Sequence, residues 1–274
     1  MSVALLCAAA GTTRQNYYRQ RSVRQRLWMD EALLLELVSQ QRAVQPCIGA
    51  RKLLYLIQSE LAGAGVSIGR DRFLRFLKNH ALLIERRARC ARTTDSWHGY
   101  RVYPNLAKDL VLTGPHQLLL SDITYLRTME GFMYLCLVSD GFSRCIVGYD
   151  CSDSLEMEGA LRALKRALKQ IPAGARAMHH SDRGSQYCCG EYIRRLKRRG
   201  VLISMTEQNH CYENSQAERL NGILKQEYGL GQTFGSKAEV AGAVKEAVML
   251  FNHHRPHTAL SYRKPIEVHR GEAA

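Results

Sequence analysis

The residues best suited to chemistry are three isolated carboxylates, Asp122, Asp182 and Glu218. Asp122 interrupts a run of apolar residues, where aspartate is rare. Asp182 follows a short predicted strand, and Glu218 lies in a stretch with helical periodicity. Taken singly, these residues could cap a turn, begin an Asx-turn or lie on the surface. As a group, separated by 59 and then 35 residues, they are candidates for a catalytic site.

One mixed α/β fold is expected to position these carboxylates. Apolar stretches bounded by turn residues predict five strands, at residues 117–127, 131–140, 145–150, 175–180 and 201–205. Helical periodicity predicts helices at residues 155–170, 191–199, 214–228 and 237–252. Three consecutive strands followed by alternating helices and strands predict a mixed five-stranded sheet flanked by helices. Asp122 then lies inside the first strand. Asp182 lies at the carboxyl end of the fourth, where α/β folds commonly gather ligands.

The helix expected at residues 214–228 has a polar stripe beside an apolar one. Asn214, Glu218, Asn221 and Lys225 recur at helical spacing and share one face. The neighbouring positions are apolar: Ala217, Leu220 and Leu224. Glu218 is therefore expected on a polar edge of a helix that packs against the sheet.

The overall charge favours a polyanionic partner. The 274 residues include 39 Lys and Arg against 25 Asp and Glu, which gives a net charge of +14 and a pI near 9.5. Residues 1–110 carry +10 of that charge and residues 111–274 carry +4. Nucleic acid is the first candidate partner, and a solubilising basic surface is the alternative.

The basic first part is expected to be helical. Residues 30–41, 51–62 and 68–79 have helical patterns, and a glycine-containing turn joins the last two. This arrangement predicts a helix-turn-helix at about residues 48–80, within a DNA-binding region at residues 1–84. The candidate DNA contacts there are Arg51, Lys52, Arg70, Arg72, Arg75 and Lys78. A solvated basic face is the alternative. Residues 85–108 are interpreted as a linker to a catalytic core at residues 109–274.

Composition also bears on the cellular compartment. The nine cysteines form no C-x-x-C pair, so reduced and mostly buried thiols are expected rather than disulfides or a zinc ribbon. No apolar run approaches the roughly 20 residues of a membrane helix, and the first ten residues have no basic segment typical of a signal peptide. We therefore expect a soluble, cytoplasmic protein.

Five ordered motifs resemble those of a known family. They occupy residues 121–125, 140–144, 180–187, 214–219 (with Lys225 and Glu227) and 252–257. Together with the 35-residue gap before Glu218, they resemble the transposases of insertion sequences of the two-frame OrfA/OrfB type, the insertion sequence 3 family. The chain is similar to the OrfB product, and the resemblance covers essentially its whole length.

The resemblance implies a retroviral-integrase-like, RNase-H-like core in which Asp122, Asp182 and Glu218 bind two Mg²⁺ or Mn²⁺ ions. Such ions would offset the repulsion among three carboxylates whose ordinary pKa values are near ~4. Hard oxygen ligands favour these ions over zinc. One ion would activate a water or a DNA 3′-hydroxyl, and the other would stabilise the leaving 3′-oxygen. The implied reaction is 3′-end cleavage of the element followed by strand transfer into target DNA.

The resemblance also implies partners. These are the terminal inverted repeats of the element, target DNA and at least a second protomer on paired ends. An upstream OrfA partner, or a fusion to it, stays open, and a bacterial protein associated with the nucleoid is implied. The candidate DNA contacts in the core are Gln186, Tyr187, Asn214, Lys225, Arg255 and His257. Packing is the alternative role for Tyr187, Arg255 and His257.

Two other functions fit parts of the sequence. The basic first part alone would suit a DNA-binding regulator without catalysis, but such a protein has no use for three intact carboxylates. An RNase-H-like nuclease that cuts without joining would need the same carboxylates. The helix-turn-helix pattern favours recognition of particular DNA ends over general hydrolysis.

Overall fold

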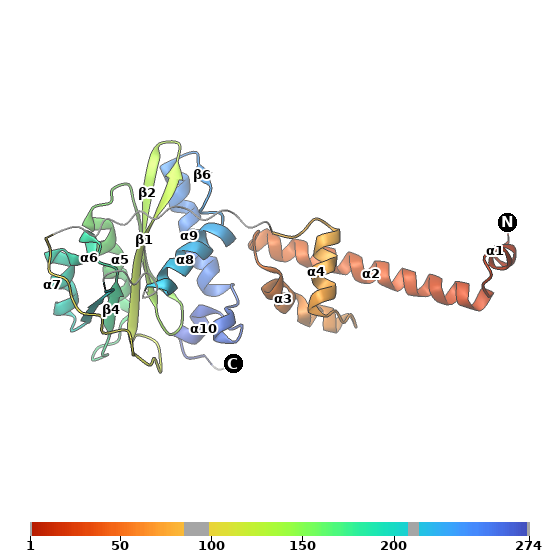
Figure 1. Cartoon of the computed structure of the whole chain (residues 1–274), viewed down its shortest axis with the longest axis horizontal. Coiled ribbons are helices and arrows are strands. Elements are labelled where there is room, and N and C mark those ends of the chain that lie inside the picture. The colour runs from red at the N-terminus through yellow and green to blue at the C-terminus, as the bar shows by residue number, and fades with distance from the viewer. Residues whose placement is uncertain (1, 85–98, 208–213, 273–274) are drawn as a thin grey trace. The chain divides into compact units, whose positions relative to one another are not determined.

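The computed structural model describes residues 2–84, 99–207 and 214–272, and it divides into two compact units. The first unit spans Met1–Ile84 and the second Glu85–Ala274. Figure 1 shows helices alone in the first unit and a sheet flanked by helices in the second. Much of the expected linker, residues 85–98, lies outside the described residues.

The first unit contains four helices among the described residues. These are α1 (Val3–Ala9), α2 (Arg14–Val44), α3 (Ala50–Gly63) and α4 (Arg70–Asn79). Leu34 and Val38 of α2, Ile57 of α3 and Phe73 and Leu77 of α4 form its buried core. The two helices and the turn expected at residues 48–80 are present as α3 and α4.

Helix α2 is much longer than the sequence pattern suggested. The helix expected at residues 30–41 is only its carboxyl-terminal part, since α2 has 31 residues. The Thr13 side chain accepts a hydrogen bond from the Asn16 amide and caps its start. The first half has no apolar stripe that packs on α3 or α4, so periodicity alone did not reveal it.

The second unit is built on a mixed sheet. Its strands are β1 (Leu118–Thr128), β2 (Gly131–Asp140), β3 (Ile146–Ser152), β4 (Met178–Ser181), β5 (Leu202–Met205) and β6 (Thr233–Phe234). Strands β1, β2 and β3 pair antiparallel, whereas β4 pairs parallel with β1 and β5 with β4. The order is β3-β2-β1-β4-β5, and the two-residue β6 pairs with the far end of β1. The expected sheet is therefore present, with this sixth short strand added.

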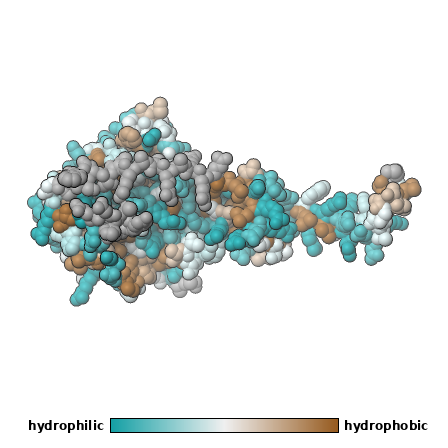
Figure 2. Space-filling model, in the orientation of Figure 1, coloured by the Kyte–Doolittle hydropathy of each residue, from teal (hydrophilic) through white to brown (hydrophobic). Residues whose placement is uncertain are grey.

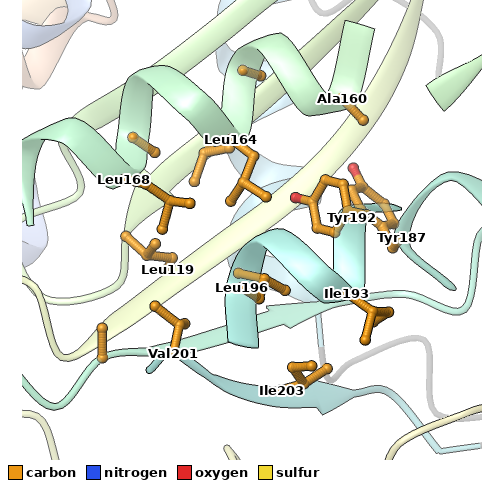
Figure 3. Close-up of a cluster of buried hydrophobic side chains, with 14 of the residues drawn as sticks. Leu119, Ala160, Leu164, Leu168, Tyr187, Tyr192, Ile193, Leu196, Val201 and Ile203 are labelled. Carbon is orange, nitrogen blue, oxygen red and sulfur yellow. The ribbon is translucent and has the colours of Figure 1, made fainter. Parts of the chain in front are cut away.

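Helices cover both faces of the sheet. One core contains α5 (Met157–Gln170) and α7 (Gly190–Arg198), and Figure 3 shows their leucines lying around Leu119 of β1. The other core contains α8 (Ser215–Glu227) and α9 (Lys237–His253), packed on Leu135 and Leu137 of β2. Helix α5 approaches β3 so closely at Gly148 that an added Cβ would lie 2.2 Å from the Ala163 carbonyl oxygen. Short helices complete the unit: α6 (Ser185–Cys188), the 3-10 helix Thr258–Leu260 and α10 (Pro265–His269).

The cysteines and the membrane prediction can be compared with the structure. The seven described cysteines are all free, and five of them are buried. Burial raises the pKa of the Cys136 and Cys188 thiols to about 12 and about 11. Cys90 and Cys211 lie outside the described residues. Over the parts of the chain that the structure describes, no helix is long and apolar enough to span a bilayer.

Candidate active site

Strand β1 directs Asp122 toward helix α8. Successive side chains on a strand alternate between faces, and Leu119 packs in the α5–α7 core. Asp122, three residues later, therefore points to the opposite face. There its Oδ2 accepts a hydrogen bond of 2.8 Å from Nδ2 of Asn221 on α8. Asn221 belongs to the polar stripe recognised in the sequence, which gave it no separate role.

The parallel pairing of β1 with β4 brings Asp182 to the same edge. Leu120 pairs with His180, so Asp122 and Asp182 each lie two residues further along neighbouring parallel strands. The Asp182 Oδ1 accepts a hydrogen bond of 3.0 Å from the Gly184 amide. A Cβ at Gly184 would lie 3.1 Å from that oxygen, which explains the small residue at this tight turn.

Glu218 comes from the first turn of α8 and is exposed. The start of this helix is fastened to β1, because Asn214 Nδ2 donates a hydrogen bond of 3.1 Å to the Ser121 carbonyl oxygen. The Asn214 and Asn221 contacts lie on either side of Glu218 in the chain. They set the position of the helix beside Asp122.

The three carboxylates interact electrostatically. Desolvation raises the pKa of Asp122 to about 7, the charge of Asp182 adds to this rise, and Glu218 makes a smaller contribution. The hydrogen bond from Asn221 acts in the opposite direction. Within the described residues, no three His, Cys, Asp or Glu side chains are grouped tightly enough to be a ready-made metal site. The three carboxylates therefore lie in one region of the core unit, but their oxygens are not gathered around a single metal position.

A buried polar cluster packs on the face of β1 opposite to the Asp122 side chain. The His179 Nε2 lies 2.7 Å from Ser121 Oγ and 2.9 Å from the Tyr192 hydroxyl. Burial lowers the pKa of His179 to about 3, so the ring is neutral at physiological pH. His179 and His180 are both 1% exposed and belong to the interior of the strand.

Arg255 does not face a DNA strand, contrary to one of the two roles suggested by the sequence. It is 3% exposed and forms two hydrogen bonds to Glu227, at 2.7 and 2.8 Å. Its guanidinium also lies 5.4 Å from the centre of the Phe251 ring. A bidentate arginine–carboxylate pair satisfies both partners, so Arg255 joins the tail to α8.

The other predicted DNA contacts of the core have different positions. Tyr187 is 3% exposed and Asn214 is buried, so neither side chain presents a surface to DNA. Gln186 is half-buried, and its Nε2 donates to the Leu155 carbonyl oxygen at 2.9 Å. Lys225 and His257 are half-buried and remain predictions.

The predicted contacts of the first unit lie on its surface. Arg70, Arg72, Arg75 and Lys78 of α4 are exposed, as is Arg51 at the start of α3, whereas Lys52 is half-buried. Phe73, Phe76 and Leu77 hold the opposite side of α4 in the core. Helix α4 therefore presents a basic face, as the second helix of a helix-turn-helix does.

Comparisons with known proteins identify the family. Residues 113–211 and 199–265 match two families that are both described as integrase core domains. The chain is 33% identical over 264 residues to the insertion element IS600 uncharacterized 31 kDa protein of Shigella sonnei, covering 95% of this chain and 96% of that protein. It is 32% identical over 223 residues to the transposase for insertion sequence element IS629 of Shigella sonnei, covering 81% and 73%. The chain belongs to the insertion sequence 3 family of transposases.

Two further comparisons agree with this family and its fold. The transposase InsF for insertion sequence IS3A of Escherichia coli (strain K12) is 38% identical over 141 residues, which are 51% of this chain and 49% of that protein. Among solved structures, a chain of the simian T-cell lymphotropic virus intasome aligns with a TM-score of 0.50 at 15% identity. That alignment covers 86% of this chain and 75% of the viral chain, and it supports the integrase-like fold.

Proposed function

We propose that Asp122, Asp182 and Glu218 are the catalytic carboxylates of this transposase and that they hold two divalent cations. The observation that carries the proposal is the placement of these residues: Asp122 and Asp182 lie at matching positions of neighbouring parallel strands, and Asn221 joins the helix that carries Glu218 to Asp122. The raised pKa of Asp122, caused first by desolvation and then by the charge of Asp182, agrees with this placement. Divalent cations would offset the repulsion among such carboxylates. Oxygen ligands alone suit Mg²⁺ or Mn²⁺.

Each carboxylate has a distinct task in this proposal. Asp122, on the rigid central strand and hydrogen-bonded by Asn221, is the fixed ligand. Asp182 is held by the Gly184 amide at the end of β4. Glu218, exposed on the first turn of α8, is the ligand free to adjust when a metal and DNA arrive. When bound, the two ions would polarise the scissile phosphate, activate the attacking hydroxyl and stabilise the leaving 3′-oxygen.

The substrate in this proposal is the DNA of the element. The chain would cleave the 3′ ends at the terminal inverted repeats and join them to target DNA, with at least two protomers on the paired ends. Exposed Arg70, Arg72, Arg75 and Lys78 would grip the duplex. An upstream OrfA partner would add a further DNA-binding segment.

The test is a strand-transfer assay with labelled element ends and Mg²⁺. Asp182→Asn should lower joining by at least ~1,000-fold, because metal ions supply several kcal/mol of transition-state stabilisation. Asp153→Asn is the matched control, since Asp153 is exposed and lies outside the site, and it should leave joining unchanged. Undiminished joining by Asp182→Asn would refute the assignment. Cleavage without joining by the wild-type chain would instead favour a nuclease.

A further inference from the structure

The first half of α2 is a basic surface. It lies within the expected DNA-binding region at residues 1–84, but none of its residues is among the candidate DNA contacts named from the sequence. Residues 14–29 of this helix, here called the basic arm, contain five arginines: Arg14, Arg19, Arg21, Arg24 and Arg26. Residues 1–29 contain no acidic residue, and the first carboxylate is Asp30. Every residue from 18 to 29 is exposed. Figure 2 shows hydrophilic surface over most of the visible arm.

The positive charge of the arm is not balanced by the described part of the protein. None of its five arginines forms an ion pair or a side-chain hydrogen bond with any residue that the structure describes. Like charges three or four residues apart, such as Arg21 and Arg24, destabilise an isolated helix. A bound polyanion would remove that repulsion, so the arm is suited to an anionic partner.

One face of the arm combines arginines with aromatic rings. Tyr17, Arg21, Arg24 and Trp28 follow one another at i, i+4, i+7 and i+11, so they share a face of the helix. Trp28 is 69% exposed although tryptophan is usually well buried. This face is distinct from the one that places Leu34 and Val38 in the core. The opposite side of the arm carries Arg19 and Arg26, which provide a matched pair of charges without the rings.

We propose that the Tyr17–Arg21–Arg24–Trp28 face of the basic arm binds duplex DNA along its phosphate backbone. This inference rests on the proposed function, because the duplex is the DNA on which the transposase acts. The arm is about 24 Å long at ~1.5 Å per residue, which spans roughly seven phosphates of one strand. Arginine forks match phosphate oxygens, and tyrosine and tryptophan supply hydrogen-bond donors and apolar contact area. A second copy of the helix fits poorly, since arginines would meet arginines without any carboxylate between them.

The experiment measures binding of the full chain to a fluorescent DNA duplex in EDTA, so that no cleavage occurs. Arg21→Gln/Arg24→Gln should raise Kd by about tenfold or more at 0.1 M salt. It should also reduce the slope of log affinity against log salt by about 1.8, which is ~0.9 for each phosphate that is no longer neutralised. Arg19→Gln/Arg26→Gln removes the same charge from the opposite side and should change Kd by less than about threefold. Circular dichroism checks that both variants keep their helices.

A second measurement reports direct contact. In a Trp97→Phe background Trp28 is the only source of tryptophan emission, since the chain has two tryptophans, and duplex DNA should alter that emission. Equal effects of the two arginine pairs, or no effect of either, would overturn the proposal. If Arg21→Gln/Arg24→Gln changes the sedimentation coefficient of the protein but leaves its DNA affinity unchanged, the arm would instead contact another protein chain, and the proposal would be wrong. If the arm variants bind normally while Asp182→Asn abolishes joining, the arm inference fails and the proposed catalytic function stands. If Asp182→Asn joins DNA normally while the arm variants no longer bind it, the assignment of the catalytic carboxylates fails and the DNA-binding role of the arm stands.

Discussion

Several arginine side chains of the core unit are held by the protein's own oxygens, whereas the five of the basic arm have no such partners among the described residues. Arg255 pairs with Glu227, and Arg162 pairs with Asp150 at 2.8 Å. Arg199 donates to two backbone carbonyl oxygens at the end of α5. The net charge of a region therefore does not say which charges can reach DNA. These three arginines of the core unit are structural, and we propose that arginines of the first unit contact DNA.

The largest effect is expected where an arginine is structural. Arg255→Ala should lower the free energy of unfolding by about 3–5 kcal/mol, because it leaves the Glu227 carboxylate without its bidentate partner. Chemical denaturation measures this change. Arg219→Ala, at an exposed position of α8, is the control and should cost less than about 0.5 kcal/mol. If Arg255→Ala were fully stable but bound DNA weakly, the comparison between the two units would fail.

The second-largest effect on the free energy of unfolding is expected at a carboxylate of the core unit, Asp122. Asp122→Asn should raise the free energy of unfolding at pH 8 in EDTA by up to about 4 kcal/mol, since one pKa unit corresponds to ~1.4 kcal/mol. The folded state raises the pKa of Asp122 from 3.8 to about 7, so it binds the proton more tightly than the unfolded chain does. Wild-type stability therefore falls as the pH rises through this window, and the advantage of the variant should vanish near pH 4.

Mg²⁺ provides the control for that measurement. It should raise the melting temperature of the wild-type chain, because a ligand that binds only the folded state stabilises it. It should have little effect on Asp122→Asn. A variant less stable than wild type at pH 8 would mean that the Asp122 carboxylate is not under electrostatic strain.

The sequence predicted the sheet well because its strands have strong local patterns. Residues 131–140 begin with a glycine, continue as a nearly unbroken apolar run and end before the turn at residues 141–144, and β2 spans them. The Asp182 position followed from its place after a short strand, and the parallel register of β1 and β4 gives it the expected neighbour. The 35 residues between Asp182 and Glu218 indicated a shared site only together with the family resemblance.

What the sequence did not predict depends on tertiary contacts. Strand β6 has two residues and forms only because β1 offers a free edge there. The burial of Arg255 depends on Glu227, 28 residues away, so no local pattern distinguishes it from a DNA-binding arginine. The first half of α2 lacks an apolar face, which is the usual signal of a helix in a folded unit. The absence of acidic residues before Asp30 was a visible signal that could have marked the arm.

The smallest effect on stability is expected on α4, where the charges are exposed. Arg72→Gln/Arg75→Gln should change the free energy of unfolding by less than about 0.5 kcal/mol, because neither side chain is buried. Binding to the element's ends should still weaken.

Competition between an end sequence and a shuffled duplex separates two causes of weaker binding. Removing phosphate contacts weakens binding to both duplexes equally, whereas removing base contacts reduces the preference for the end sequence. Since a recognition helix reads bases and the arm is expected to grip phosphates, the α4 variant should lose preference and the arm variant should not. Unchanged binding by the α4 variant would leave the arm as the main DNA contact of the first unit.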